Sequence, residues 1–61
     1  MNKSELREIV ILATMHKLGM TDTVARGLSA LIRAARTKKS AAALREYADI
    51  FSVTNHPEFI C

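Results

Sequence analysis

The stretch that decides the fold reads DTVARGLSALIRAART and spans residues 22–37. Its apolar side chains recur at intervals of three and four residues, which places them along one side of an α-helix. These apolar positions are Val24, Leu28, Leu31, Ile32 and Ala35. The spacing predicts a helix over about 22–37 with one buried stripe, and it places the arginines of the stretch on the opposite, outer face.

Two further features of this stretch bear on how the helix begins and packs. Thr21 and Asp22 offer a hydroxyl and a carboxylate to the free N–H groups at a helix start, so they predict its N-terminal cap. Gly27 lies in the middle of the helix, where it costs about 1 kcal/mol relative to Ala. The commonest reason for such a glycine is close packing against another helix, which we expect here.

The chain before this stretch predicts a first helix over about 4–18. Asn2 and Glu5 have the spacing of a capping box, and Ser4 is an equally good cap. Gly19 provides the left-handed residue that commonly ends a helix. The first two helices are therefore separated by a short turn.

The chain after it predicts a third helix over about 41–53. The Thr37–Ser40 segment interrupts the apolar pattern, and Ser40 can cap a helix whose face carries Leu44, Ala48 and Phe51 together with Tyr47. A continuous helix over 22–53 is the alternative, because neither Gly nor Pro occurs in residues 28–56. Pro57 predicts a turn over 54–57, and residues 58–61 either dock as a small apolar plug or fray.

Length and composition limit the class of protein. A chain of 61 residues forms a single domain over 1–61 and has a marginal core, so we expect an all-α three-helix domain stabilised by a partner subunit or another binding partner. Cys61 is the only cysteine, so no disulfide forms within the chain. The apolar run at 9–15 is too short to span a bilayer and no signal-peptide pattern follows it, so we expect a cytoplasmic protein without membrane contact.

The first helix carries more apolar residues than one buried face requires. On a helical wheel they form two stripes, and a helix that is apolar nearly all round should be buried nearly all round. The first stripe holds Leu6, Ile9, Val10 and Ala13, and the second holds Ile11, Leu12, Met15 and Leu18. Either this helix lies centrally between the other two, or one stripe forms a dimer or partner surface, which is the interpretation we favour. We expect the second stripe to mediate self-association in a homodimer.

Positive charge is concentrated in the middle of the chain. Six of the nine Lys and Arg residues lie in 23–45, a segment without Asp or Glu. They are Arg26, Arg33, Arg36, Lys38, Lys39 and Arg45. Such a set could contact phosphates or an acidic protein surface, whereas the simplest alternative is a solvated face with cations near a favourable helix C-terminus.

Candidate catalytic and metal-binding residues are scattered. His16, His56 and Cys61 lack the short spacing that brings two donors to one metal ion. His16 is followed by Lys17 and His56 by Pro57, so neither has an obvious orienting carboxylate. Cys61 has no neighbouring base. We therefore expect no enzyme activity, no metal, no cofactor and no small-molecule substrate.

The junction between the first two helices invites comparison with a helix-turn-helix motif, whose second helix reads DNA. The matching residues are 18–21 and 23–26, about 20 residues with their flanks. Met15 occupies a position that is normally small, and Val24 falls one place out of register. This comparison leaves a small basic nucleic-acid-binding regulator as the alternative function.

A second likeness covers more of the chain, from Ala13 to Phe51. Its pieces are Gly19, the pair Val24–Ala25, Leu28, the pair Ala34–Ala35 and the closing run Tyr47–Ala48–Asp49–Ile50–Phe51. In this layout the chain resembles the small helical AraC-negative-regulator and PerC-like families of enteric bacteria. Those families carry tryptophans where this chain has Leu28 and Leu44, and a late cysteine where it has Phe51. The resemblance implies a small regulator that binds a transcription factor or nucleoid protein, so we expect a non-enzymatic interaction protein that self-associates and binds a protein partner.

Overall fold

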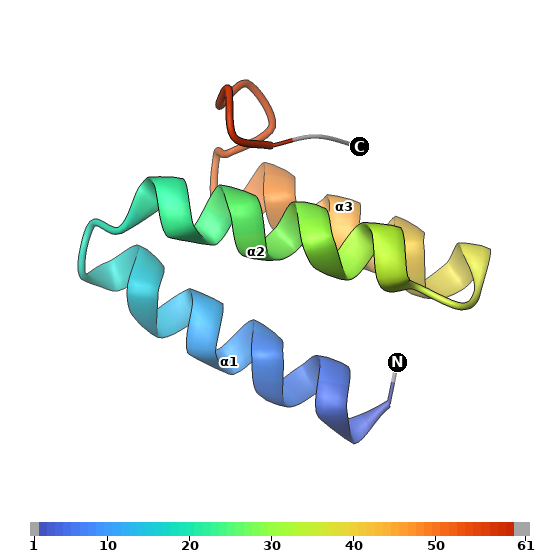
Figure 1. Cartoon of the computed structure of the whole chain (residues 1–61). Helices are drawn as coiled ribbons and strands as arrows, with labels where there is room; N and C mark the ends of the chain where they lie inside the picture. The colour runs from blue at the N-terminus through green and yellow to red at the C-terminus, as the bar shows by residue number, and fades with distance from the viewer. Residues whose placement is uncertain (1, 60–61) are drawn as a thin grey trace.

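The computed structural model describes residues 2–59, which fold into three α-helices and form no strand. Helix α1 spans Lys3–Lys17, α2 spans Thr21–Ala34 and α3 spans Lys38–Ile50. Helix α2 runs alongside α1 and α3 and packs against both of them (Figure 1). This arrangement confirms a small all-α domain of three helices. None of the helices in the described part of the chain is both long and apolar enough to cross a membrane.

The boundary between α2 and α3 excludes the continuous helix considered above. Ala35 is extended, with φ −62° and ψ 130°, so α2 ends at Ala34, three residues earlier than expected. Thr37 is also extended, and its Oγ1 accepts the backbone N–H of Ser40 at 3.0 Å. Thr37 therefore caps α3, which begins three residues earlier than expected. Ser40 is buried inside the helix, and the prediction that it is the cap was wrong.

The starts of α1 and α2 differ in how they are capped. Asn2 caps α1 as predicted, since its Oδ1 accepts the backbone N–H of Glu5 at 2.9 Å. The turn between the helices contains Gly19 in the left-handed region, with φ 80°, which confirms its expected role. At α2 the cap position is Met20, which makes no side-chain capping bond. The expected Thr21 and Asp22 cap was wrong, because both residues lie inside the first turn of α2.

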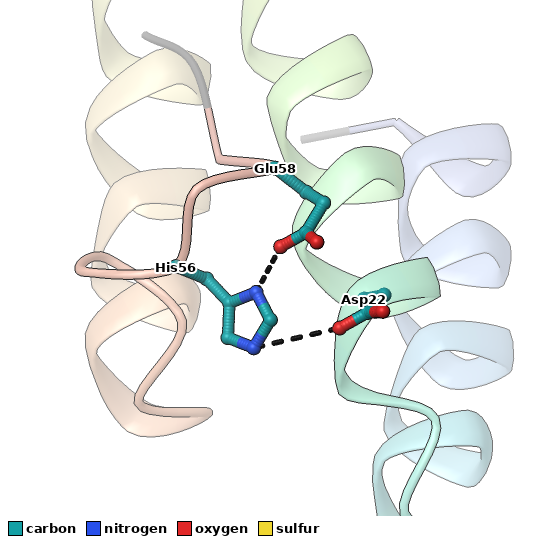
Figure 2. A group of neighbouring side chains, drawn as sticks. All are labelled: Asp22, His56 and Glu58. Atoms are coloured by element: carbon teal, nitrogen blue, oxygen red, sulfur yellow. Dashed lines mark hydrogen bonds and ion pairs between the residues drawn. The ribbon is translucent and has the colours of Figure 1, made fainter.

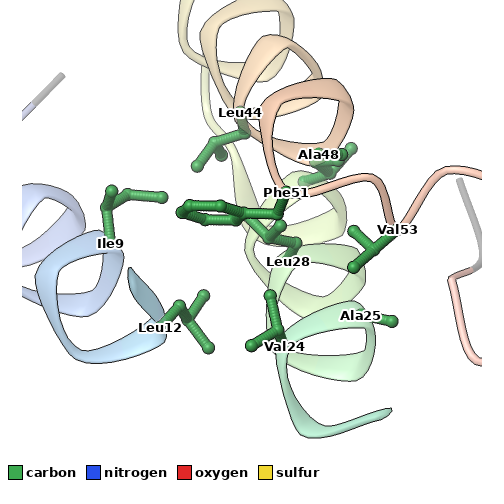
Figure 3. Close-up of a cluster of buried hydrophobic side chains, with 10 residues drawn as sticks. Ile9, Leu12, Val24, Ala25, Leu28, Leu44, Ala48, Phe51 and Val53 are labelled. Carbon is green, nitrogen blue, oxygen red and sulfur yellow. The ribbon is translucent and has the colours of Figure 1, made fainter. Parts of the chain in front are cut away.

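The core is formed around α2 (Figure 3). Its buried apolar residues are Ile9 and Leu12 of α1, Val24, Ala25, Leu28 and Ile32 of α2, Leu44 and Ala48 of α3, and Phe51 and Val53 after α3. The predicted stripe of α2 is confirmed at Val24, Leu28 and Ile32, while Leu31 and Ala35 are half-buried. The alternative that placed the first helix at the centre is wrong, because α2 occupies that position.

Gly27 explains how closely α1 approaches α2. A Cβ atom built at Gly27 would lie 2.6 Å from Cδ2 of Leu12, well inside van der Waals contact. The missing side chain makes room for Leu12, which is buried in the core. The expected reason for this glycine, close helix packing, is confirmed.

The chain after α3 folds back over the bundle. Ser52 takes a positive φ of 57°, and the N–H of Val53 then bonds to the carbonyl of Ala48 at 3.0 Å. Val53 is fully buried, and Phe59 is half-buried against the core. The predicted turn over 54–57 is confirmed, and Phe59 provides part of the predicted apolar plug. The remainder of that segment, residues 60 and 61, lies outside the described residues.

Candidate functional site

The side of α1 that faces away from the core carries large apolar side chains in contact with solvent. Leu6, Val10, Ile11 and Leu18 are all exposed, Val10 by 64% and Leu18 by 72%. The four-residue spacing aligns Leu6, Val10, Thr14 and Leu18 along one ridge of the helix, with Ile11 beside it. These five residues are called the outer face of α1 below.

Thr14 does not interrupt the apolar character of this ridge. Its Oγ1 donates to the carbonyl oxygen of Val10 at 3.1 Å, so the hydroxyl is satisfied within the helix itself. With the hydroxyl held against the backbone, the methyl group becomes the part of Thr14 available to a partner. The outer face is therefore an apolar ridge from Leu6 to Leu18, with the exposed Arg7 beside Val10 and Ile11.

The four residues expected to mediate self-association do not all lie on this face. Ile11 and Leu18 are exposed, Met15 is half-buried against the core, and Leu12 is only 5% exposed. The side of α1 that packs against the core lies between the two predicted stripes. It therefore buries Ile9 from the first stripe and Leu12 from the second. Leu12 is thus held within the chain's own core, while Val10 and Leu6 join Ile11 and Leu18 in solvent.

The six basic residues expected to form one partner-binding set are all exposed, but they do not form one face. Four of them, Arg33, Arg36, Lys38 and Lys39, lie where α2 ends and α3 begins, and we call this group the basic end. Arg26 lies near the start of α2 beside His56. Arg45 lies along α3, beside Asp49 and the folded-back tail. The structure therefore separates the set into a cluster of four and two outlying residues.

The basic end is not explained by favourable helix electrostatics alone. Arg33 is in the last turn of α2, where the negative end of the helix dipole favours a cation. Lys38 and Lys39 are in the first turn of α3, which has no acidic residue and where the dipole disfavours cations. Within residues 2–59 the four side chains form no ion pair or side-chain hydrogen bond. An anionic partner would relieve this unbalanced positive charge.

A cluster of three ionisable side chains links the tail to α2 (Figure 2). Nε2 of His56 lies 3.5 Å from Oδ1 of Asp22, in the first turn of α2. Nδ1 of the same ring is bonded to Oε2 of Glu58. The hydrogen bond from His56 lowers the pKa of the Glu58 carboxyl below its usual 4.5, and the positive charge of Arg26 lowers this pKa further.

The cluster opens onto a hollow of about 420 Å³ that is accessible to solvent. Asp22 and His56 line it, together with Thr21, Thr23 and Arg26. Ligand atoms of Asp22, His56 and Glu58 all lie within 4.8 Å of one another, a separation that would allow a metal ion between them. The structure thus places a possible metal-binding group where the sequence predicted none.

The cluster was not predicted because the residue next to His56 is Pro57, and the carboxylate of Glu58 lies one position further along the chain. The expectation that His56 lacks an orienting carboxylate was wrong, since Glu58 follows it by only two residues. The spacing of His56 and Glu58 could have indicated their contact from the sequence. Asp22 is distant in the sequence, so no nearby residues indicate that it meets His56. His16, by contrast, is exposed and stacks on Phe51, with ring centroids 5.0 Å apart.

No protein-family model, curated protein or solved structure matches this chain.

Proposed function

We propose that this chain is a small, non-enzymatic, cytoplasmic regulatory protein that self-associates through the outer face of α1 and binds a protein partner through its basic end. The observation that carries the proposal is the apolar ridge on α1, which the fold leaves in solvent. Contiguous exposed apolar surface of this kind marks interaction sites in small proteins. The regulatory role rests on the likeness in layout to the AraC-negative-regulator and PerC-like families.

The geometry of the outer face favours a second copy as its occupant. In the commonest class of helix packing, ridges formed by residues four apart interdigitate with ridges of the same kind, and the two helices cross at about −50°. The crossing point would fall near Val10 and Thr14, where the small Thr14 allows close approach. At this angle the helix ends diverge, so Lys3 and Lys17 of the two copies are carried away from one another.

The size of the surface sets the expected strength of the dimer. A stable interface takes about 800 Å² from each partner. That area would be about a fifth of the 4302 Å² surface of this chain, which is more than one helix face provides. We therefore expect a dimer that forms at micromolar concentration rather than an obligate one.

Sedimentation velocity over a concentration series tests the self-association. The wild type should shift from monomer to dimer in the micromolar range, and Val10→Glu should remain monomeric because a dimer would bury the new charge. Ile50→Glu is the matched control, since Ile50 lies on α3 and is 69% exposed, close to the exposure of Val10. A wild type that stays monomeric at millimolar concentration would refute this part of the proposal.

The unbalanced cations at the start of α3 support an anionic ligand for the basic end, and the alternative function is nucleic-acid binding. The double variant Arg33→Glu with Arg36→Glu should keep its fold, because both side chains are exposed. If the ligand is an acidic protein surface, the wild type should bind random duplex DNA weakly or not at all. If it is DNA, binding should fall steeply with salt, and the log–log slope should shrink by roughly 1 for each phosphate contact removed.

A further inference from the structure

We propose that Asp22 and His56 form a binding site for a divalent transition-metal ion of the zinc type, with Glu58 orienting the imidazole. This site is separate from the outer face of α1 and from the basic end. It joins the N-terminal turn of α2 to the folded-back tail.

The separation of the two donor atoms fits a tetrahedral ion. Zinc binds imidazole nitrogen at about 2.0–2.1 Å and carboxylate oxygen at about 2.0–2.2 Å, so neighbouring donors around it lie about 3.4 Å apart. Nε2 of His56 and Oδ1 of Asp22 are 3.5 Å apart. The ion would therefore need no rearrangement of the backbone to contact both atoms.

The contact between Glu58 and the other ring nitrogen prepares the imidazole for this role. With Nδ1–H donating to Oε2 of Glu58, the tautomer that carries its lone pair on Nε2 is favoured. Metal-binding histidines commonly donate their second N–H to a carboxylate in this way, which fixes the ring and raises its basicity. Glu58 is thus a positioning residue rather than a ligand.

The surroundings provide room for the rest of the coordination shell. Asp22 and His56 both line the solvent-accessible hollow of about 420 Å³, while Glu58 is not part of its lining. Water can occupy the two remaining positions of a tetrahedral ion from this side. An imidazole donor also favours zinc and related ions over magnesium or calcium, which prefer oxygen ligands only.

Local charge limits the affinity. The carboxylates of Asp22 and Glu58 favour a cation, whereas Arg26 lies on the same hollow and the positive end of the α2 dipole is close to Asp22. Because only two protein side chains bind the ion, and Arg26 and the α2 dipole repel it, we expect a micromolar dissociation constant and not a lower one. Removing the positive charge with Arg26→Gln should make zinc binding several-fold tighter, a change that a purely structural role of the cluster would not produce.

Isothermal titration of the full chain with zinc chloride tests the site. The series should be run in the wild type and in Cys61→Ser, because a thiolate would bind zinc independently of this cluster. We expect His56→Gln and Asp22→Asn to weaken binding at least ten-fold, and Glu58→Gln to weaken it about ten-fold. The matched control His16→Gln should bind zinc like the wild type.

The imidazole nitrogen resonances of the wild-type chain provide a readout that does not depend on the folding of any variant. Zinc should shift Nε2 of His56 and leave His16 unchanged. The proposal is overturned if zinc shifts His16 instead, if folded His56→Gln retains wild-type affinity, or if all binding disappears in Cys61→Ser. None of these results would affect the self-association of α1, which is measured without metal.

Discussion

Helices α1 and α2 are both rich in apolar residues, but the fold uses those residues differently. In α2 the large apolar side chains Val24, Leu28 and Ile32 are buried, and the exposed side carries arginines. In α1 only Ile9 and Leu12 are buried, while Leu6, Val10 and Ile11 are exposed to solvent. Burial in the core explains the large apolar side chains of α2, but it explains only some of those in α1. The outer face of α1 is therefore where a function requiring apolar contact should be sought.

Truncating one leucine in α2 and one at the C-terminal cap of α1 is the strongest way to break this comparison. Leu28→Ala should lower the free energy of unfolding by about 2–5 kcal/mol, because Leu28 is fully buried at the centre of the core. Leu18→Ala removes the same atoms from a side chain that is 72% exposed, so at concentrations where the chain is monomeric it should change stability by less than about 0.5 kcal/mol. Urea denaturation measures both. Equal losses would show that the two leucines have similar environments.

The N-terminal caps of α3 and α1 provide a smaller test, because each cap bonds a backbone N–H in the first turn of its helix. Thr37→Ala should cost about 1 kcal/mol, because the hydroxyl of Thr37 bonds the N–H of the buried Ser40 at the start of α3. Asn2→Ala removes the equivalent bond from the exposed start of α1 and should cost about 0.5 kcal/mol. Thermal melts monitored by circular dichroism should rank them in this order. The reverse ranking would contradict the early start assigned to α3.

The smallest expected effect concerns the cluster that holds the tail against α2. Because the pKa of Glu58 is lower in the folded chain than its ordinary value of 4.5, the unfolded chain takes up the proton first as the pH falls. The stabilisation is therefore complete above about pH 4.5 and is lost as the pH falls through the folded value. Urea titrations at a series of pH values should show this loss in the wild type.

Two variants check the assignment of that pH dependence. In Glu58→Gln, the part of the acid-induced loss of stability that comes from Glu58 should be absent. In His56→Gln this part should be smaller, because His56 is the main cause of the lowered pKa of Glu58. If both variants lose stability between pH 5 and pH 3 as the wild type does, the dependence comes from other carboxyl groups.

The features that sequence predicted well are those determined by nearby residues. The number of helices, the buried side of α2 and the turn at Gly19 follow from apolar spacing and from one left-handed glycine. The cap of α3 was misassigned because Thr37 and Ser40 both carry a hydroxyl, and the choice between them depends on which of the two has an extended backbone, which is Thr37. Neighbouring residues alone do not decide such a choice.

The features that sequence predicted poorly depend on contacts between distant segments. The apolar content of α1 suggested a central helix or a second contact surface. The burial of Ile9 and the packing of Leu12 against Gly27 show which side of α1 is buried. The meeting of Asp22 with His56 requires the tail to fold back, which follows from the turn at Ser52 and the burial of Val53. Helical periodicity carries no signal for either arrangement.

The claim that the outer face of α1 joins two copies of the chain is tested most directly by isotope-filtered NMR. A mixture of labelled and unlabelled protein at millimolar concentration isolates the nuclear Overhauser effects between copies from those within one chain. We expect contacts between copies among the methyl groups of Val10, Thr14 and Leu18. Self-association through the outer face of α1 is contradicted if contacts between copies are absent at this concentration, or if they involve Ile50 of α3 and not α1.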